Sequence, residues 1–252
     1  MKNILLKTEQ LSKSFSTGGT LQHVLKNISL ELCQGDFTVI MGASGAGKST
    51  LLYALSGMDT PSLGTITFGG RVISDMGQDE LAVFRRSHCG FVFQQIYLIE
   101  GMSLMDNVLA AGLLVSKDKK ALLAKARELF SCVGISEDTW KKFPAQISGG
   151  EAQRAGIVRA LINSPEILFA DEPTGALNSK TGLDVLDTLT RFNEQGQSVV
   201  MVTHDMRSAR RGSRILYLKD GAILGECRLG RWAHGDRERH EKLSAFLSEM
   251  GW

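Results

Sequence analysis

The sequence predicts an α/β fold with a central parallel sheet, an antiparallel β subdomain and a helical subdomain inserted into the core. Short apolar runs at residues 167–170 and 198–203 are separated by a helix-like stretch, as in a doubly wound parallel sheet. Residues 3–40 alternate apolar and polar side chains in short runs, which indicates antiparallel strands. Between residues 104 and 161 apolar side chains recur at helical spacing, which indicates the helical subdomain.

The other expected elements connect these regions in chain order. They are a hairpin at residues 65–73, a helix at 79–88, a buried strand at 90–93, a helix at 179–195, an edge hairpin at 215–224 and a tail helix at 237–252. The core then comprises residues 3–93 and 164–230, the helical subdomain residues 94–163, and a helical tail residues 231–252.

Composition and charge exclude several classes of protein. The chain has 252 residues and a net charge of +2, which is too small to indicate a nucleic-acid partner, so we expect none. Its four cysteines are scattered without a Cys-x-x-Cys pair, so we expect free thiols rather than a zinc site or disulfides. No run reaches the roughly 18 apolar residues of a spanning helix, and any membrane association should be peripheral.

One segment departs from the overall charge balance. Residues 207–242 contain ten Lys or Arg and five Asp or Glu, a local charge of +5. The segment is either a solvated face or a contact for anionic lipid headgroups or an acidic partner.

The stretch from Gly42 to Ser49 fits the phosphate-binding pattern G-x-x-x-x-G-K-[ST], placed between an apolar strand and a helix start. In such a loop the backbone N–H groups surround phosphates, Lys48 reaches the β and γ oxygens, and the Ser49 hydroxyl binds Mg²⁺. The alternative is a glycine-rich turn with a surface lysine. The residues that we expect to contact nucleotide here are Gly42, Ser44, Gly45, Ala46, Gly47, Lys48, Ser49 and Thr50.

Two acidic residues end the apolar run at 167–170. Asp171 is suited to hold Mg²⁺ through its water, and Glu172 is suited to polarise an attacking water molecule. Without the phosphate loop, an ordinary exposed turn would be the preferred interpretation of such a pair. Together with the loop, the pair predicts ATP hydrolysis.

Gln94 and His204 each follow a predicted strand. The amide of Gln94 can face Mg²⁺ and its water, and His204 can hold the γ-phosphate and Glu172 in register. Taken alone, each is more simply a polar residue at a strand end. Phe15 offers a flat face for adenine stacking, with packing in the core as an equal alternative.

A second glycine-rich turn, Ser148-Gly149-Gly150-Glu151, opens another predicted helix and forms a second candidate anion site. One phosphate group cannot easily occupy two such turns in different lobes of one chain. Two chains placed head to tail would let each nucleotide contact the phosphate loop of one chain and the Ser-Gly-Gly turn of the other. The sequence therefore predicts a closed two-fold pair that encloses two nucleotides.

The order of these motifs resembles the nucleotide-binding subunit of ABC transporters over residues 3–230. The resemblance implies that Phe15 is the adenine-stacking aromatic, that Ser49 and Gln94 touch Mg²⁺, and that residues 148–151 act across a dimer. It also implies that Glu172 is the catalytic base and His204 the switch histidine. Residues 90–94 and 170–175 resemble the group of macrolide exporters and lipoprotein-releasing ATPases, and residues 41–44 with the tail look most like its bacitracin and lantibiotic resistance branch.

Several positions depart from the family pattern. Phe15 stands where tyrosine is usual, Glu151 replaces the common glutamine, and no proline follows Gln94 closely. Asn178 stands where aspartate is usual, which keeps the shape but removes the charge. Residues 95–101 are expected to face the permease.

The resemblance implies an ATPase subunit on the cytoplasmic side of a membrane that drives a separate permease, with ATP and Mg²⁺ as cofactors. The expected cargo class is antimicrobial peptides, with lipoprotein release, macrolide export or a regulatory role without transport as alternatives. A soluble ABC protein acting on DNA or ribosomes is the rival from another class, and the absence of a basic footprint speaks against it.

Overall fold

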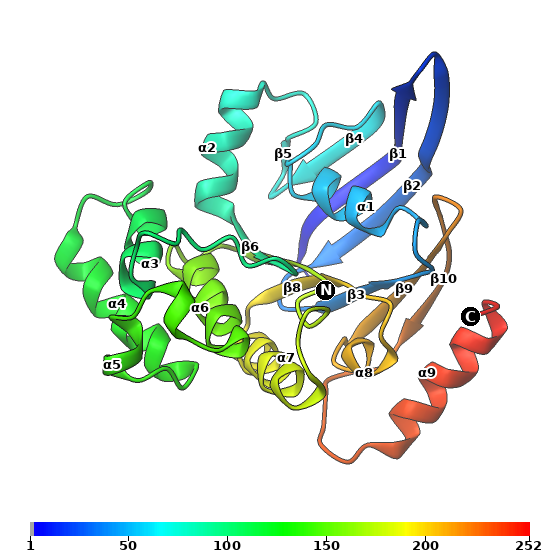
Figure 1. The fold of residues 1–252 in the computed structure, drawn as a ribbon. Coiled ribbons are helices and arrows are strands. Elements are labelled where there is room, and N and C mark those ends of the chain that lie inside the picture. Colours follow the sequence, from blue (N-terminus) through cyan, green and yellow to red (C-terminus); the bar gives the residue numbers. More distant parts are fainter. Residues whose placement is uncertain (1–2) are drawn as a thin grey trace. The chain divides into compact units, whose positions relative to one another are not determined.

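The computed structural model describes residues 3–252, and it divides into two compact units (Figure 1). The first unit comprises the chain up to Leu81 together with Asn193–Trp252, and the second comprises Ala82–Phe192. This division differs from the subdomain limits expected from the sequence, because it groups residues 82–93 and 164–192 with the helical region and assigns the tail to the first unit.

The first unit contains the expected antiparallel sheet, with strand order β2-β1-β4-β5. Its strands are β1 (Ile4–Thr17), β2 (Thr20–Cys33), β4 (Leu63–Phe68) and β5 (Arg71–Val72). Alternate side chains near the end of β2, Ile28, Leu30 and Leu32, are buried, as expected for a sheet with one covered face. The antiparallel subdomain is therefore confirmed.

The same unit contains strands of a second sheet, in the order β10-β9-β3-β8. They are β3 (Phe37–Met41), β8 (Ser198–Val202), β9 (Arg214–Lys219) and β10 (Ala222–Arg228). β3 pairs in parallel with both β8 and β9, so residues 37–40 belong to this sheet and not to the antiparallel region. Every residue of β3 and β8 is buried, which explains their continuous apolar runs.

Three helices belong to the first unit. They are α1 (Lys48–Leu55), α8 (Met206–Ala209) and α9 (Arg237–Glu249). The C-terminal helix α9 packs against β10 (Figure 1). A Cβ at Gly225 of β10 would lie 3.1 Å from the ring of Phe246 in α9 and 2.7 Å from the sulfur of Met250, which follows the helix. The edge of the Tyr217 ring also meets the terminal Trp252. The tail is thus part of the hydrophobic packing of this unit.

The second unit combines two parallel strands with a set of helices. The strands are β6 (Cys89–Phe93) and β7 (Ile167–Asp171). The helices are α2 (Gln78–His88), α3 (Leu104–Gly112), α4 (Lys119–Cys132), α5 (Glu137–Trp140), α6 (Gly149–Leu161) and α7 (Ser179–Glu194), with a short 3₁₀ turn at Pro144–Gln146. Ser103 and Asp118 cap α3 and α4 through side-chain oxygens. Within the described part of the chain, no helix is long and apolar enough to cross a membrane.

Candidate functional site

The phosphate loop joins the end of β3 to the start of α1. Gly47 caps α1 with a φ of 99°, a left-handed conformation that glycine adopts without strain. A Cβ at Gly42 would lie 2.2 Å from the carbonyl oxygen of Leu218, so only glycine fits there. The strand, loop and helix start expected from the sequence are therefore present, with both ends of the loop held by glycine.

Lys48 folds back over the loop that precedes it. Its side chain is 7% exposed, and its Nζ donates to the carbonyl oxygens of Gly42 and Ala43 at 2.9 Å each. These bonds hold a nearly buried cation against the loop that leads into the N-terminus of α1, where backbone N–H groups are available to bind an anion. Such a combination of positive charge and backbone donors suits a phosphate group.

Phe15 lies on β1, where its side chain is 40% exposed. This exposure excludes simple core packing, one of the two alternatives that the sequence left open. Lys13 lies beneath the ring face, with Nζ 4.9 Å from the ring centre. The exposed part of the ring remains available for stacking.

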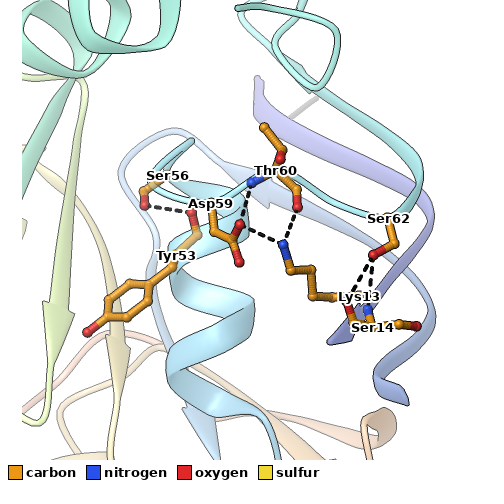
Figure 2. Close-up of polar contacts among 7 residues, drawn as sticks. All are labelled: Lys13, Ser14, Tyr53, Ser56, Asp59, Thr60 and Ser62. Carbon is orange, nitrogen blue, oxygen red and sulfur yellow. Dashed lines mark hydrogen bonds and ion pairs between the residues drawn. The ribbon is translucent and has the colours of Figure 1, made fainter. Parts of the chain in front are cut away.

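Lys13 also ties β1 to the segment that follows α1 (Figure 2). Its Nζ contacts Asp59 Oδ1 at 2.6 Å and the Thr60 carbonyl oxygen at 2.7 Å. Nearby, the Ser14 backbone N–H donates to Ser62 Oγ at 3.0 Å. This network, which we call the Lys13 clamp, holds the strand that carries Phe15 against the end of the phosphate-loop helix.

His204 follows β8 in an exposed position, as expected from the sequence. The next residue, Asp205, accepts hydrogen bonds from the Ser208 backbone N–H and hydroxyl, both at 2.8 Å. Burial raises the pKa of the Asp205 carboxyl, but these hydrogen bonds outweigh it and hold the pKa below its usual value. The chain after His204 is therefore fixed by a capped turn.

In the second unit, Asp171 ends β7 and Glu172 follows it directly. Glu172 has a φ of 43°, a left-handed conformation that is uncommon for a residue with a side chain. Its carbonyl oxygen accepts from the Gly175 N–H at 3.0 Å, which holds the turn in place. Backbone strain of this kind is concentrated at functional sites, which agrees with the catalytic role predicted for Glu172.

Gln94 follows β6 in the same unit and lies against the segment after Glu172. A Cβ at Gly175 would be 2.8 Å from Gln94 Nε2, so the Gln94 side chain and the backbone at Gly175 lie very close together. Gln153 of α6 donates to the Phe93 carbonyl oxygen at 2.9 Å and so fixes the end of β6. The structure thus brings Gln94 next to the turn that carries Glu172.

The turn at Ser148 forms a capping box at the start of α6. Ser148 Oγ accepts from the Glu151 N–H at 3.3 Å, and Glu151 Oε2 accepts from the Ser148 N–H at 2.8 Å and from its hydroxyl. These bonds, first that from the Ser148 backbone, hold the pKa of Glu151 below its usual range. Gly150 packs on α7, because a Cβ there would lie 2.0 Å from Thr181.

Asn178 caps the next helix rather than pointing freely to solvent. Its Oδ1 accepts from the Thr181 N–H at 3.0 Å, directly before α7 begins at Ser179. Asparagine and aspartate are about equally good at this position of a helix. The departure from the family pattern therefore preserves the local fold while removing a charge.

Sequence reasoning did not identify the residues that shape the loop after Gln94. Arg159 of α6 donates to the carbonyl oxygens of Tyr97 and Ile96, at 2.5 Å and 2.6 Å. Asn107 of α3 contacts the backbone of Ile99 as both donor and acceptor. Arg159 lies 62 residues from Tyr97 along the chain, so no local pattern could have revealed the contact.

Comparison with known proteins identifies the family. The family described as ABC transporter matches residues 25–175. An uncharacterised ABC transporter ATP-binding protein of Methanocaldococcus jannaschii is 41% identical over 87% of this chain and 98% of its own length. The macrolide export ATP-binding/permease protein MacB 2 of Yersinia pestis is 42% identical, but the chain spans only 33% of that protein.

A solved structure gives the same result. The dimeric post-hydrolysis structure of an ATP-binding cassette bound to ADP and Pi has a TM-score of 0.83 and 38% identity, over 90% of this chain and all of that one. The predicted core with its antiparallel and helical subdomains is the fold of that cassette. The chain therefore belongs to the ABC transporter family, as one of its ATPases.

Proposed function

We propose that the phosphate loop binds the phosphates of ATP, with Lys48 drawn from the loop carbonyls to the β and γ oxygens. The observation that carries this proposal is the nearly buried Lys48 cation held over a glycine-bounded loop at the N-terminus of α1. Phe15 stacks on the adenine, supported by its 40% exposure. Glu172 orients the attacking water, and His204 holds the γ-phosphate.

The donor set also fits Mg²⁺. Ser49, Gln94 and Asp171 offer a hydroxyl, an amide and a carboxylate oxygen, which are the ligand types that Mg²⁺ prefers. When bound, the ion would neutralise charge that develops on the phosphates.

A second copy of the chain completes the site in this proposal. The N-terminus of α6, with the Ser148 hydroxyl and the first N–H groups of the helix, is a second phosphate-binding turn. The cassette that this chain resembles was solved as a dimer. We infer a head-to-tail pair in which the turn at residues 148–151 of one copy closes on the nucleotide of the other.

Two variants test the ATPase site directly. Lys48→Ala should abolish ATP hydrolysis, and Glu172→Gln should abolish turnover while stable dimers accumulate with ATP, seen as a dimer peak in size-exclusion chromatography. Lys7→Ala is the matched control, since the Lys7 side chain is exposed and forms a surface ion pair with Glu9. Normal hydrolysis by Lys48→Ala would contradict the assignment of the loop, and brisk hydrolysis by Glu172→Gln would remove Glu172 from its role.

We further propose that the ATPase drives a separate membrane permease, which docks on the loop held by Arg159. Tyr97 is 64% and Ile99 is 53% exposed, so this loop presents two large side chains to solvent. Tyr97 also has a φ of 51°, so the loop is held in a specific, strained conformation. In a reconstituted complex, Arg159→Met should leave ATP affinity unchanged and reduce permease-dependent transport.

For cargo, we propose antimicrobial peptides of the bacitracin or lantibiotic type, on the basis of residues 41–44 and the tail. Macrolide export is the second candidate, favoured by the relatives that carry that name. Deletion in the native host distinguishes them through minimal inhibitory concentrations. A fall for bacitracin or nisin alone supports the first candidate, and a fall for erythromycin alone supports the second.

A further inference from the structure

A cavity of about 430 Å³ lies in the first unit at the start of α9, and none of the proposed ATP-binding residues lines it. It is lined by Arg210, just after α8, by Trp232, and by residues around the first turns of α9, namely Gly235, Asp236, Arg237, His240 and Glu241. Its volume lies within the range of small-molecule sites, roughly 300–1,000 Å³.

Two of the lining residues hold a buried N–H group without a hydrogen-bond partner. They are Arg210, through Nε, and Trp232, through Nε1. Within residues 3–252, the only other buried side-chain nitrogens in this state are the Nε atoms of Arg154 and Arg214. Buried donors are nearly always satisfied, so two such groups at one cavity call for an explanation. Because both are donors, the missing partner must be an acceptor.

The wall behind the cavity is rigid and positively charged. Arg239 is 2% exposed and fastens three chain segments together through its guanidinium. It donates to the carbonyl oxygens of Arg210, Gly212, Leu229, Gly230 and Arg231. Trp232 lies against two guanidinium groups, with its ring centre 4.4 Å from Arg211 and 5.6 Å from Arg239. Two arginines of the basic segment, Arg211 and Arg239, are thus buried and do not belong to a solvated face.

The charges around the cavity favour an anion. Arg210 and Arg237 line it, and Arg211 and Arg239 lie behind Trp232. Among the lining residues, the carboxylates of Asp236 and Glu241 balance the two arginines, so the positive excess comes from Arg211 and Arg239 against the Trp232 ring. Asp236 is already engaged, since its Oδ1 accepts from the Arg239 N–H at 2.9 Å as the cap of α9.

We propose that this cavity binds a small molecule with a phosphate group, which accepts hydrogen bonds from Arg210 Nε and Trp232 Nε1. The indole and the aliphatic parts of the arginines cover the organic part of the ligand. The phosphate belongs either to a soluble phosphate ester or to the headgroup of an anionic lipid, and the recognition chemistry is the same. The inference does not depend on ATP binding at the phosphate loop.

The indole N–H resonance of Trp232 reports directly on this site. The ¹⁵N-labelled full chain is titrated with glycerol 3-phosphate, and the resonance is assigned with Trp232→Phe, which keeps an aromatic side chain but removes the indole N–H donor. The Trp232 resonance should move, while those of Trp140 and Trp252 stay. Because the assigned signal comes from the cavity, phosphate bound at the loop near Lys48 does not confuse the result.

The lipid arm uses sedimentation with vesicles of phosphatidylglycerol, whose headgroup contains glycerol phosphate, and of phosphatidylcholine as the neutral control. Arg210→Gln should weaken binding at least about tenfold, as expected for a lost charge-assisted hydrogen bond. Arg228→Gln removes an equal charge from an exposed side chain and should have no effect.

An Arg210-dependent shift with glycerol 3-phosphate supports a soluble ligand, and Arg210-dependent sedimentation with phosphatidylglycerol alone supports a lipid headgroup. If Arg210→Gln changes neither measurement, or if neither probe binds, the proposal is wrong. The thermal midpoint of each variant verifies that it is folded.

Discussion

Replacing Lys13 with methionine tests whether the Lys13 clamp positions Phe15 for nucleotide binding. The Lys13 side chain is 11% exposed, and its Nζ makes two short bonds, to Asp59 Oδ1 and to the Thr60 carbonyl oxygen. A hydrogen bond of this charged type contributes about 1.5–3 kcal/mol to stability when buried. Asp59 is 33% exposed and keeps its bond from the Thr60 N–H, so water replaces part of the loss.

We therefore expect Lys13→Met to lower the free energy of unfolding by about 2 kcal/mol, which for a chain of this size lowers Tm by about 4–8 °C. Stacking of a base on an aromatic ring contributes about 1–3 kcal/mol, so Phe15→Ala should raise the Kd for ATP by about 5- to 150-fold. Lys13→Met leaves the ring in place but releases its strand, so it should raise the Kd by a smaller factor.

The assay is ATP binding by isothermal titration calorimetry for the two single variants and the double variant. If the clamp acts through Phe15, their effects on Kd are not additive, with a coupling energy above about 0.5 kcal/mol. Lys7→Met, on the same strand but exposed, is the control. Additive effects, or an ATP affinity that Lys13→Met does not change, would refute the positioning role.

Three further predictions concern contacts made by Arg239, Glu151 and Asn178. Arg239→Met leaves five carbonyl acceptors without their shared donor and should destabilise the chain by about 3–5 kcal/mol in urea unfolding, whereas the exposed Arg228→Met should change little. Hydrogen bonds lower the pKa of Glu151 in the folded chain, so its stabilising contribution is complete above the ordinary glutamate pKa of about 4.3 and is lost as pH falls through the folded pKa. The difference in unfolding free energy between the unaltered chain and Glu151→Gln should therefore shrink on acidification. A difference that does not change with pH would contradict this. Asn178→Asp should keep the cap of α7 and change the free energy of unfolding by less than about 0.5 kcal/mol, while Asn178→Ala should lower it by about 1 kcal/mol. If Asn178→Asp also leaves the ATPase rate and its cooperativity unchanged, the residue matters only for shape.

Local patterns predicted the elements that rest on local requirements. The glycine-bounded loop before Lys48, the alternation in β1 and β2 and the glycine-rich turn that opens α6 each depend on neighbours within a few residues. The roles assigned to Gln94, Glu172 and His204 remain predictions, although the strained Glu172 backbone and the contact of Gln94 with Gly175 agree with them.

Long-range contacts were beyond such patterns. Lys13 contacts Asp59, 46 residues further along the chain, and Arg159 contacts the carbonyl oxygen of Tyr97, 62 residues before it. Neither separation follows a local pattern that would have singled out these residues from others of the same type. The basic segment at residues 207–242 shows the same limit. Its composition left a solvated face and a contact for an anionic partner open, and it did not reveal that Arg211 and Arg239 are buried against backbone carbonyls and an indole ring.

The sequence by itself determined the family, the α/β class and the position of the phosphate loop. These depend on motifs of glycine and lysine and on apolar periodicity, which involve residues close together in the sequence. Only the tertiary structure decided that Phe15 is exposed, that the tail packs on β10, and that a cavity with two unpaired donors forms beside α9. These features depend on which segments meet in space, and a single side chain such as Arg239 of α9 satisfies carbonyls from two other segments at once.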